Sequence, residues 1–339
     1  MNWDWTPETR LKLATELVRL GLSDGEDLPA ITPIGDGHSN LTYRVDTEQT
    51  SLVLRRPPPP PLPPGSNDVL REARIQSALN ETQFPVTKII ATGEAGSLFD
   101  VPYYIMSMVD GDVITSSMPP RFDVPEQRRQ IGFELIRTIA ELHLVDWQAI
   151  GLSNLGRPDG FNARHLKRMA GILTDEDRAK YPQFGEIQQW LESNCPEEGS
   201  PALIHNDCRI GNVMWARGDT PRIAAVLDWE LATIGDPMLD LAYTVSSLPR
   251  EGECRHPVQD FAAACLGEGF PDQQALLAHY FDVTGAGPVH LDWYLAMVNW
   301  KLAILYAYSR RKGVDNYYQD ESHVPRLIAE ARHYIDISR

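Results

Sequence analysis

The sequence has few of the features that mark secreted, membrane-spanning or nucleic-acid-binding proteins. Only four of its 339 residues are cysteines, and they show neither C-x-x-C pairing nor a zinc-ligand spacing; free thiols in a reducing compartment are the simplest interpretation. No stretch approaches the roughly 20 consecutive apolar residues that cross a bilayer, and the first residues lack the basic and apolar regions of a secretory signal. With 47 acidic against 31 basic residues, the net charge of −16 argues against nucleic acid or anionic lipid as a partner. We therefore expect a cytoplasmic protein that binds neither.

What the sequence does contain is enough apolar material for a sizeable core. Hydrophobic residues make up 42% of the chain, and its length suits either two domains or one unit of two lobes. We expect an α+β fold, with an antiparallel sheet in residues 1–108 and a mostly helical part in residues 109–339. The first part is expected to hold a helix that starts at Thr6-Pro7, strands within 31–54, a helix at 68–79 and a strand at 103–108. In the second part, short strands are expected before residue 205 and at 223–227, and helices at 127–144, 181–194, 260–266, 273–283, 291–311 and 324–337.

The most informative motif lies at residues 205–212, which read H-N-D-C-R-I-G-N, and it is followed by Asp228 at the end of an apolar run. An Asp on a short loop can accept the proton of a hydroxyl group. An Asn five residues later and an Asp at the mouth of the next strand can hold the Mg²⁺ that bridges the phosphates of ATP. The spacing therefore predicts a phosphoryl-transfer site, with Asp207 as the catalytic base and with Asn212 and Asp228 as metal ligands.

Charged residues close to this motif are further candidates. Arg209 lies two residues after Asp207, where a cation can neutralise charge on the migrating phosphoryl group, and we predict a catalytic role for it. Glu230 lies two residues after Asp228 and faces the same side if the strand continues. It is either a ligand of a second Mg²⁺, directly or through water, or a solvated surface carboxylate. His205 is expected to form hydrogen bonds within the loop rather than to transfer protons.

These motifs resemble those of the aminoglycoside-phosphotransferase and choline-kinase group of small-molecule kinases, in which the loop has the form H-x-D-x-x-x-x-N. The closest likeness is to the branch found beside, or fused to, acyl-CoA dehydrogenases. It runs from about Ile34 to about Lys312 and includes the segments G-x-S-N-L-T-Y, V-L-R-R-P-P, L-D-W-E-L-A-T-x-G-D-P-x-x-D-L-A-Y and W-Y-L-A. The resemblance implies a two-lobed protein-kinase-like fold, ATP and Mg²⁺ as cofactors, and an alcohol group of a small molecule as phosphate acceptor. It also implies that Asp236 and Asp240 tie the following helix to the catalytic loop through hydrogen bonds.

The resemblance makes residues 1–108 the nucleotide-binding lobe. Arg55 occupies the position of the strand Lys that grips the α- and β-phosphates in many kinases, and a guanidinium group can clamp phosphate as well. Arg56 points to the opposite face of the strand and is the weaker candidate. Glu72 is similar to the helix Glu that pairs with that cation, and an ordinary exposed carboxylate is the alternative interpretation.

Two backbone segments complete the expected nucleotide site. The amides of Gly37 and Ser39 are expected to lie near the phosphates, in a loop that folds over them. The segment from Met106 to Met108 is expected to be the hinge at which adenine forms hydrogen bonds to the backbone, because this segment joins the two lobes.

The identity of the acceptor is left open by the resemblance. The family label suggests an aminoglycoside or another antibiotic, whereas the dehydrogenase-associated branch suggests a metabolite such as a hydroxyacyl-CoA. A non-catalytic nucleotide-binding regulator is the third alternative. The segment 291–312 carries several aromatic residues and one acid, Asp292, against Lys301, Arg310, Arg311 and Lys312. That balance suits a partly apolar or anionic acceptor better than a polycation, because like charges repel.

Overall fold

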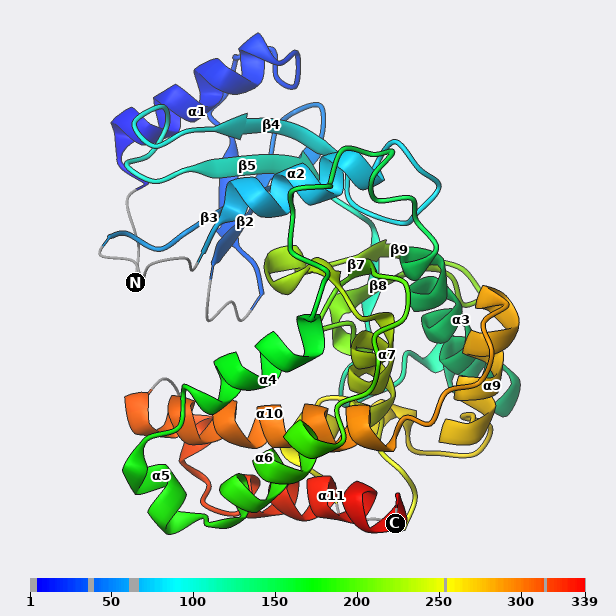
Figure 1. Cartoon of the computed structure of the whole chain (residues 1–339). Coiled ribbons are helices and arrows are strands. Elements are labelled where there is room, and N and C mark those ends of the chain that lie inside the picture. The colour runs from blue at the N-terminus through cyan, green and yellow to red at the C-terminus, as the bar shows by residue number, and fades with distance from the viewer. Residues whose placement is uncertain (1–4, 36–39, 61–66, 253–254, 314–315, 339) are drawn as a thin grey trace. The chain divides into compact units, whose positions relative to one another are not determined.

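The computed structural model describes residues 5–35, 40–60, 67–252, 255–313 and 316–338, and the chain divides into two compact units (Figure 1). Unit 1 consists of Met1–Asp110 together with Ala225–Glu230, and unit 2 of Gly111–Ala224 and Leu231–Arg339. The expected mixture of an antiparallel sheet and many helices, an α+β fold, is confirmed. None of the helices in the described ranges is both long and apolar enough to cross a membrane.

Unit 1 is built on a five-stranded antiparallel sheet with the order β1-β2-β3-β5-β4. The strands are β1 (Ala30–Pro33), β2 (Leu41–Asp46), β3 (Ser51–Arg56), β4 (Ile89–Gly93) and β5 (Tyr103–Ser107). Helix α1 (Pro7–Arg19) begins at the expected cap, where the hydroxyl of Thr6 accepts the amide of Thr9. It buries Leu13 and Leu17 in the apolar core of the sheet. Helix α2 (Val69–Leu79) packs along β4 and β5, and β4 is the one strand of this sheet that we did not predict.

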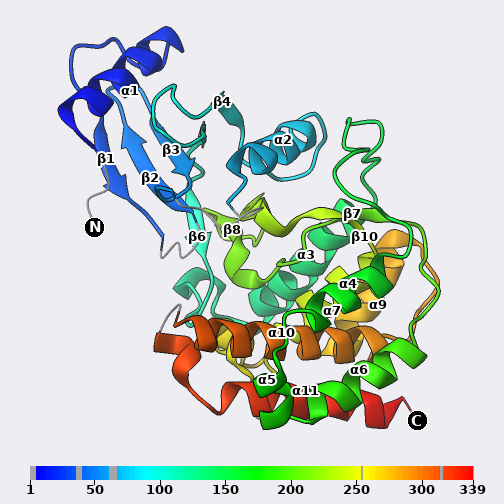
Figure 2. The ribbon, with the colours of Figure 1, turned by 60° about the vertical axis from the view of Figure 1, so that its left-hand side comes forward.

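Unit 2 is mostly helical, and helix α10 (Asp292–Lys312) is buried over most of its circumference (Figure 2). It packs against four other helices, which are α4 (Phe161–Ala170), α6 (Gln183–Ser193), α7 (Pro237–Ser246) and α11 (His323–Ile337). Helix α3 (Pro125–His143) packs against α9 (Gln273–Thr284), and two short helices, α5 (Asp175–Lys180) and α8 (Pro257–Asp260), complete the described set. The sequence did not reveal α4 or α5. Helix α5 buries none of its side chains, so it has no apolar repeat to detect.

Two small sheets frame the motif at residues 205–212. In one, β7 (Ala202–Ile204) pairs with β10 (Thr233–Gly235); in the other, the order is β6 (Gly111–Val113), β8 (Val213–Ala216) and β9 (Ile223–Val226). The motif connects β7 to β8. All three residues of β7 are buried, and the motif ends in a 3-10 turn, Ile210–Asn212.

The prediction of a helix at residues 260–266 was wrong. Helix α8 ends at Asp260, and only a single 3-10 turn, Ala263–Cys265, follows it. The guanidinium group of Arg128 donates to the carbonyl oxygens of Ala264 (2.7 Å) and Leu266 (3.0 Å). Those oxygens are therefore held by a side chain from α3, and the chain turns away instead of continuing a helical ladder.

Candidate active site

The loop at residues 205–212 is held by one buried carboxylate. The backbone amides of His205 and Asn206 donate to Oδ2 and Oδ1 of Asp240, both at 2.7 Å. Asp240 lies on α7 and is fully buried. Asn206 has a left-handed backbone with φ of 67°, which Asn adopts more readily than most residues. The expectation that Asp240 ties the helix to the loop is confirmed, and Nδ1 of His205 accepts the amide of Asp207 at 3.3 Å, within the loop as predicted.

The Asp240 carboxylate has a further partner. Nε2 of His143 on α3 donates to Oδ2 of Asp240 at 3.2 Å, and Nδ1 of the same ring lies 2.8 Å from the hydroxyl of Tyr280. Burial opposes ionisation of Asp240, but the hydrogen bonds from His143 and from the backbone of His205 outweigh it, so the pKa of this carboxyl lies below its usual value.

Asp236 caps α7 at the amide of Met238 (2.9 Å), as expected for an acidic residue at a helix start. Its Oδ2 accepts from Nδ2 of Asn162 on α4 (2.7 Å) and from the hydroxyl of Tyr294 on α10 (2.9 Å), so the expectation that Asp236 ties α7 to the loop at residues 205–212 was wrong.

Asp207 is oriented by three neighbours from unit 2. Nδ2 of Asn212 donates to its Oδ2 and also to its carbonyl oxygen, both at 2.8 Å. The hydroxyl of Tyr243 donates to Oδ1, and Nε of Arg209 lies 3.8 Å from the same oxygen. The structure therefore brings together Asp207, Arg209 and Asn212, as the spacing predicted. The Asp207 side chain is still 22% exposed, so a small molecule can reach it.

Tyr243 is a contact of this site that the sequence analysis missed. Burial raises the pKa of its hydroxyl well above the usual value, and the charge of Asp207 raises it further, so the phenol stays protonated and donates. Its signal was present in the segment D-L-A-Y, which places Tyr243 three residues after Asp240 and thus on the neighbouring face of one helical turn.

Asn212 also has a group that fits a metal ion. Both hydrogen bonds of its amide are made by the nitrogen, and in the described part of the chain its oxygen accepts none. A carbonyl-type oxygen suits Mg²⁺, which takes few protein ligands and keeps much of its water. No group of three or more His, Cys, Asp or Glu side chains in the described ranges could hold a metal ion.

The second set of candidate residues lies in unit 1 and centres on Arg55 of β3. Its Nε lies 3.0 Å from Oε2 of Glu72 on α2, and its Nη2 lies 2.7 Å from Oδ1 of Asp228. Glu72 is only 1% exposed and also accepts hydrogen bonds from Nδ2 of Asn40 (2.8 Å) and from the hydroxyl of Tyr104 (3.1 Å). The predicted pairing of Arg55 with Glu72 is confirmed, and the alternative of an exposed carboxylate was wrong.

Burial and charge act against each other in this cluster. Burial raises the pKa of Glu72 to about 7, while the cation of Arg55 acts in the opposite direction. For Arg55, burial disfavours the charged form, but Glu72 and Asp228 more than offset it, so its pKa is raised and it stays charged. Arg56 points to the other face, where its guanidinium lies 4.7 Å from the ring centroid of Phe99.

Asp228 lies in a turn, so the assumption that a continuing strand places Glu230 on the same side as Asp228 was wrong. Strand β9 ends at Val226, Asp228 has φ of 64°, and a 3-10 turn spans Trp229–Leu231. Two residues along such a turn do not share a face as they would in a strand. The backbone carbonyl of Glu230 accepts from Nη1 of Arg71 at 3.4 Å. Oδ2 of Asp228 accepts no hydrogen bond within the described ranges, so it is available to a ligand.

The remaining candidates differ in accessibility. Met106 lies inside β5, opposite Val53 and Ile89, while Met108 follows the end of that strand and is exposed. The amide of Ser107 between them already donates to the carbonyl of Lys88 at 2.9 Å. Of this expected hinge, Met108 is therefore the residue whose backbone lies beyond the sheet. Gly37 and Ser39 lie outside the described residues.

Replacing Arg55 with Met is expected to destabilise the protein by about 3–5 kcal/mol at pH 8, because it leaves Glu72 buried beside Asp228 without a cation. The pKa of Glu72 is raised in the fold, so its neutral form is the one that folding favours, and the loss should shrink as the pH falls below about 7. Denaturant unfolding at several pH values measures this. The matched control is Arg44→Met on β2, whose ion pair with Asp46 is exposed and worth at most about 1 kcal/mol. Equal losses for the two variants would contradict the argument.

A carboxylate oriented on a loop beside an arginine and an amide oxygen is an arrangement that suits phosphoryl transfer. The chain belongs to the phosphotransferase enzyme family, whose sequence model (APH) matches residues 30–294. This membership confirms the predicted family and the predicted type of enzyme, a phosphotransferase with an alcohol group as acceptor.

Solved structures of related proteins agree with the fold. A putative aminoglycoside phosphotransferase from Ralstonia eutropha JMP134 is 27% identical, with a TM-score of 0.78 over 96% of this chain and 97% of that one. Choline kinase from Cryptosporidium parvum Iowa II reaches a TM-score of 0.63 at 13% identity, over 96% of this chain and 97% of that one, and thus shares the fold. The expected kinase-like fold is confirmed.

Curated relatives are longer proteins. Acyl-CoA dehydrogenase family member 11 of Gallus gallus is 32% identical over 215 residues, which are 63% of this chain and 27% of that protein. Probable acyl-CoA dehydrogenase IBR3 of Arabidopsis thaliana is 29% identical over 301 residues, which are 83% of this chain and 36% of that protein. The chain thus spans between about a quarter and about a third of the length of these relatives.

Proposed function

We propose that the protein transfers the γ-phosphoryl group of ATP to a hydroxyl group of a metabolite, with Mg²⁺ as cofactor. The observation that carries this proposal is the setting of Asp207, which Tyr243 and Asn212 orient while its side chain stays partly exposed. Asp207 holds the acceptor hydroxyl and takes its proton. Because the proton leaves late in a loose transition state, position matters more than basicity. Arg209 offsets the negative charge on the migrating group.

The spacing of the sequence motif assigns the metal ligands. Oδ1 of Asn212 and the carboxylate of Asp228 would hold Mg²⁺, which neutralises phosphate charge when bound. Arg55, positioned by Glu72, would contact the phosphates, and residues 1–108 would form the nucleotide-binding lobe, with Met108, whose backbone lies beyond the sheet, contacting the adenine. The relative APH(4)-Ia has been solved with AMP-PNP and with ADP, each together with hygromycin B, which supports a nucleoside triphosphate as donor.

Two classes of acceptor follow from different observations. The curated relatives are named as acyl-CoA dehydrogenase family members, and a hydroxyacyl-CoA is the metabolite that fits this association. In α10, Asp292 is the one acid, against four basic residues, and this supports an acceptor that is not a polycation. An aminoglycoside is the second candidate, because several solved relatives are phosphotransferases of that kind.

A turnover assay with labelled ATP tests the proposal. The full chain is incubated with Mg²⁺, ATP and either hydroxyacyl-CoAs, aminoglycosides, macrolides or choline-like alcohols, and kcat/KM is compared across the classes. We expect a hydroxyacyl-CoA to be the best acceptor. An aminoglycoside that is phosphorylated faster than every acyl-CoA would overturn the choice of acceptor. Absence of phosphoryl transfer to any of them, with ATP still bound, would favour the nucleotide-binding regulator.

Asp228→Asn is expected to weaken Mg-ATP binding and to lower kcat together, each by about 10- to 100-fold, because one negative charge is lost where the metal binds. Calorimetric titration and steady-state kinetics measure the two effects. Asp100→Asn is the control, since this carboxylate is exposed on a loop of unit 1. Normal Mg-ATP affinity together with a normal rate in Asp228→Asn would show that another residue is the principal metal ligand.

A further inference from the structure

Lys301 of α10 is a buried cation that forms no direct ion pair within the described ranges. It is 6% exposed, and in the described part of the chain its ammonium group forms no hydrogen bond and no ion pair. Its Nζ lies 5.4 Å from the ring centroid of Tyr243. Burial lowers the pKa of Lys301, and the nearby charges of Asp207 and Asp240 act in the opposite direction. A buried ammonium group without a direct hydrogen-bonding partner is costly even when carboxylates lie nearby, so this position needs an explanation.

A second unmatched donor lies on the neighbouring helix α4. His165 is also 6% exposed, and its Nε2 has no hydrogen-bond partner in the described ranges. Its Nδ1 lies 3.2 Å from Nη2 of Arg168. A guanidinium group can only donate, so Nδ1 accepts and the proton of the neutral ring is on Nε2. Burial, together with the charges of Lys301 and Arg168, holds the pKa of His165 well below its usual range, so the ring is neutral.

Lys301 lies close to the proposed catalytic carboxylate of Asp207. Tyr243 contacts both residues: its ring faces Nζ of Lys301, and its hydroxyl donates to Asp207. An anion held by Lys301 would thus be separated from the phosphorylated hydroxyl by about the size of one phenol ring. A hydroxyl compound that carries a nearby negative charge fits both groups at once.

We propose that Lys301 and Nε2 of His165 form a subsite that binds an anionic group of the acceptor. The acceptor class is a hydroxyl compound with a carboxylate or phosphate, such as a hydroxycarboxylate or a thioester of CoA. This inference rests on the proposed function, since it concerns the second substrate of the same reaction. Lys301 and His165 are specificity-determining residues, and Arg168 positions His165 by fixing its tautomer.

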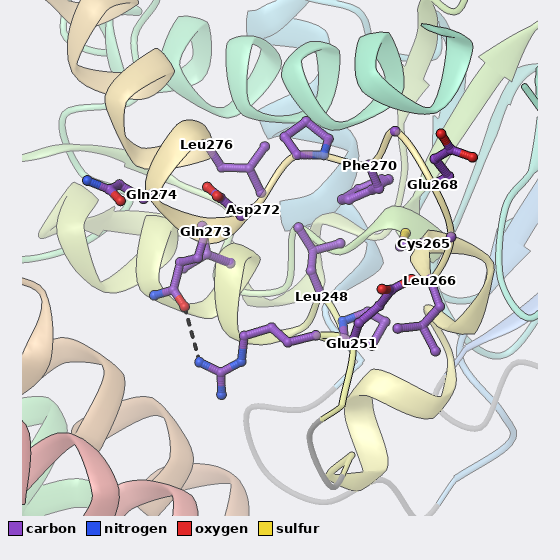
Figure 3. Close-up of a pocket in the computed structure, with 16 residues that line it drawn as sticks. Leu248, Glu251, Cys265, Leu266, Glu268, Phe270, Asp272, Gln273, Gln274 and Leu276 are labelled. Carbon is purple, nitrogen blue, oxygen red and sulfur yellow. Dashed lines mark hydrogen bonds between the residues drawn. The ribbon is translucent and has the colours of Figure 1, made fainter. Parts of the chain in front are cut away.

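Another concave part of unit 2 is lined by a cation that is already paired. A cavity of about 540 Å³ lies between the C-terminal end of α7 and the N-terminal end of α9 (Figure 3). The arginine that lines it, Arg250, is paired with Glu330 and forms hydrogen bonds with the hydroxyl of Tyr334 (2.9 Å) and with Oε1 of Gln273 (3.3 Å). Its guanidinium group is directly paired inside the protein, whereas the ammonium group of Lys301 forms no ion pair within the described ranges.

The test compares Lys301→Met with Lys312→Met, a lysine at the exposed end of the same helix. The acceptors are a hydroxybutyrate, its methyl ester and its CoA thioester. We expect Lys301→Met to raise KM for the acid at least about tenfold, since a charged hydrogen bond is lost, and to leave the ester unchanged. The same rise with the thioester would identify a CoA phosphate as the anion. His165→Leu should also raise KM, and His165→Gln, which keeps a donor, should not.

A binding measurement separates this inference from the proposed function. Without ATP, the hydroxybutyrate should raise the unfolding midpoint of the wild type and not that of Lys301→Met, and the methyl ester should raise neither. Lys301→Met by itself should unfold a few degrees higher than the wild type, because a buried unpaired charge is removed. Equal effects of the variant on acid and ester, or a lower midpoint for it, would overturn the subsite. Absence of phosphoryl transfer with anion binding intact would overturn only the proposed reaction.

Discussion

Asp207→Asn is expected to lower kcat by about 10²- to 10⁴-fold while Mg-ATP affinity stays close to that of the wild type. The amide has the shape of the carboxylate but cannot take a proton from the acceptor. Its oxygen can still accept the hydrogen bond from the hydroxyl of Tyr243, but its nitrogen cannot accept the one from Nδ2 of Asn212. The bond from Nδ2 of Asn212 to the carbonyl oxygen of residue 207 remains, so the loop should keep its conformation. Steady-state kinetics with saturating acceptor and calorimetric titration with Mg-ATP measure the two quantities separately.

The control for this variant is Asp219→Asn, an exposed carboxylate in the turn after β8. It should leave both kcat and ATP affinity unchanged. If Asp207→Asn instead loses Mg-ATP affinity while its thermal unfolding is unaltered, then Asp207 holds the metal and not the acceptor. A rate within about tenfold of the wild type would show that orientation by Arg209 and Asn212 suffices without a base.

Asp240→Asn is expected to destabilise the protein by about 3–5 kcal/mol, which is the range for removing one partner of a buried charged network. Two backbone amides and His143 donate to this carboxylate, and the nitrogen of an amide side chain would face at least one of them. Denaturant unfolding measures the loss. Because the pKa of Asp240 is lowered in the fold, the contribution is complete at neutral pH and is lost only as the pH falls below about 4.

Asp282→Asn on the exposed side of α9 is the matched control, and it should change stability by less than about 0.5 kcal/mol. Activity should follow stability in the Asp240 variant, because the amides of His205 and Asn206 would no longer position Asp207. A variant that unfolds at the wild-type denaturant concentration would mean that the loop holds its shape without the carboxylate.

Much of this arrangement could be predicted from local patterns. The cap at Thr6 started α1 where expected, because a cap is a local hydrogen bond within three residues, and apolar periodicity placed α2 to within one residue of its start at Val69. The contact of Asp207 with Asn212 followed from the spacing of the loop alone. The pairing of Arg55 with Glu72 came from a resemblance, since nothing in the chain between them indicates that β3 and α2 meet.

Other features depend on contacts that no local pattern contains. Glu230 was placed by assuming that β9 continues, but the strand stops at Val226 and the backbone turns through a left-handed Asp228. The burial of Trp229 drives this turn: its ring packs edge-on against Phe84 (5.9 Å between centroids), and its Nε1 donates to the carbonyl of Val226 at 3.0 Å. The prediction for 260–266 failed for a similar reason, because the side chain of Arg128, distant in sequence, binds the carbonyl oxygens of Ala264 and Leu266.

Because Ala225–Glu230 packs as part of unit 1, unit 1 cannot be completed early in biosynthesis. In this segment, Asp228 forms an ion pair with Arg55, and Trp229 packs against Phe84. The amide of Val226 donates to the carbonyl oxygen of Pro85 at 2.8 Å. A ribosome delivers this segment only after the whole of Gly111–Ala224 has been synthesised. Unit 1 therefore cannot acquire its complete set of native contacts during translation of its own first stretch, and these distant pairings belong to the slow class of folding events. A fragment that ends at Asp110 would leave Phe84 uncovered and Arg55 without one of its two carboxylates.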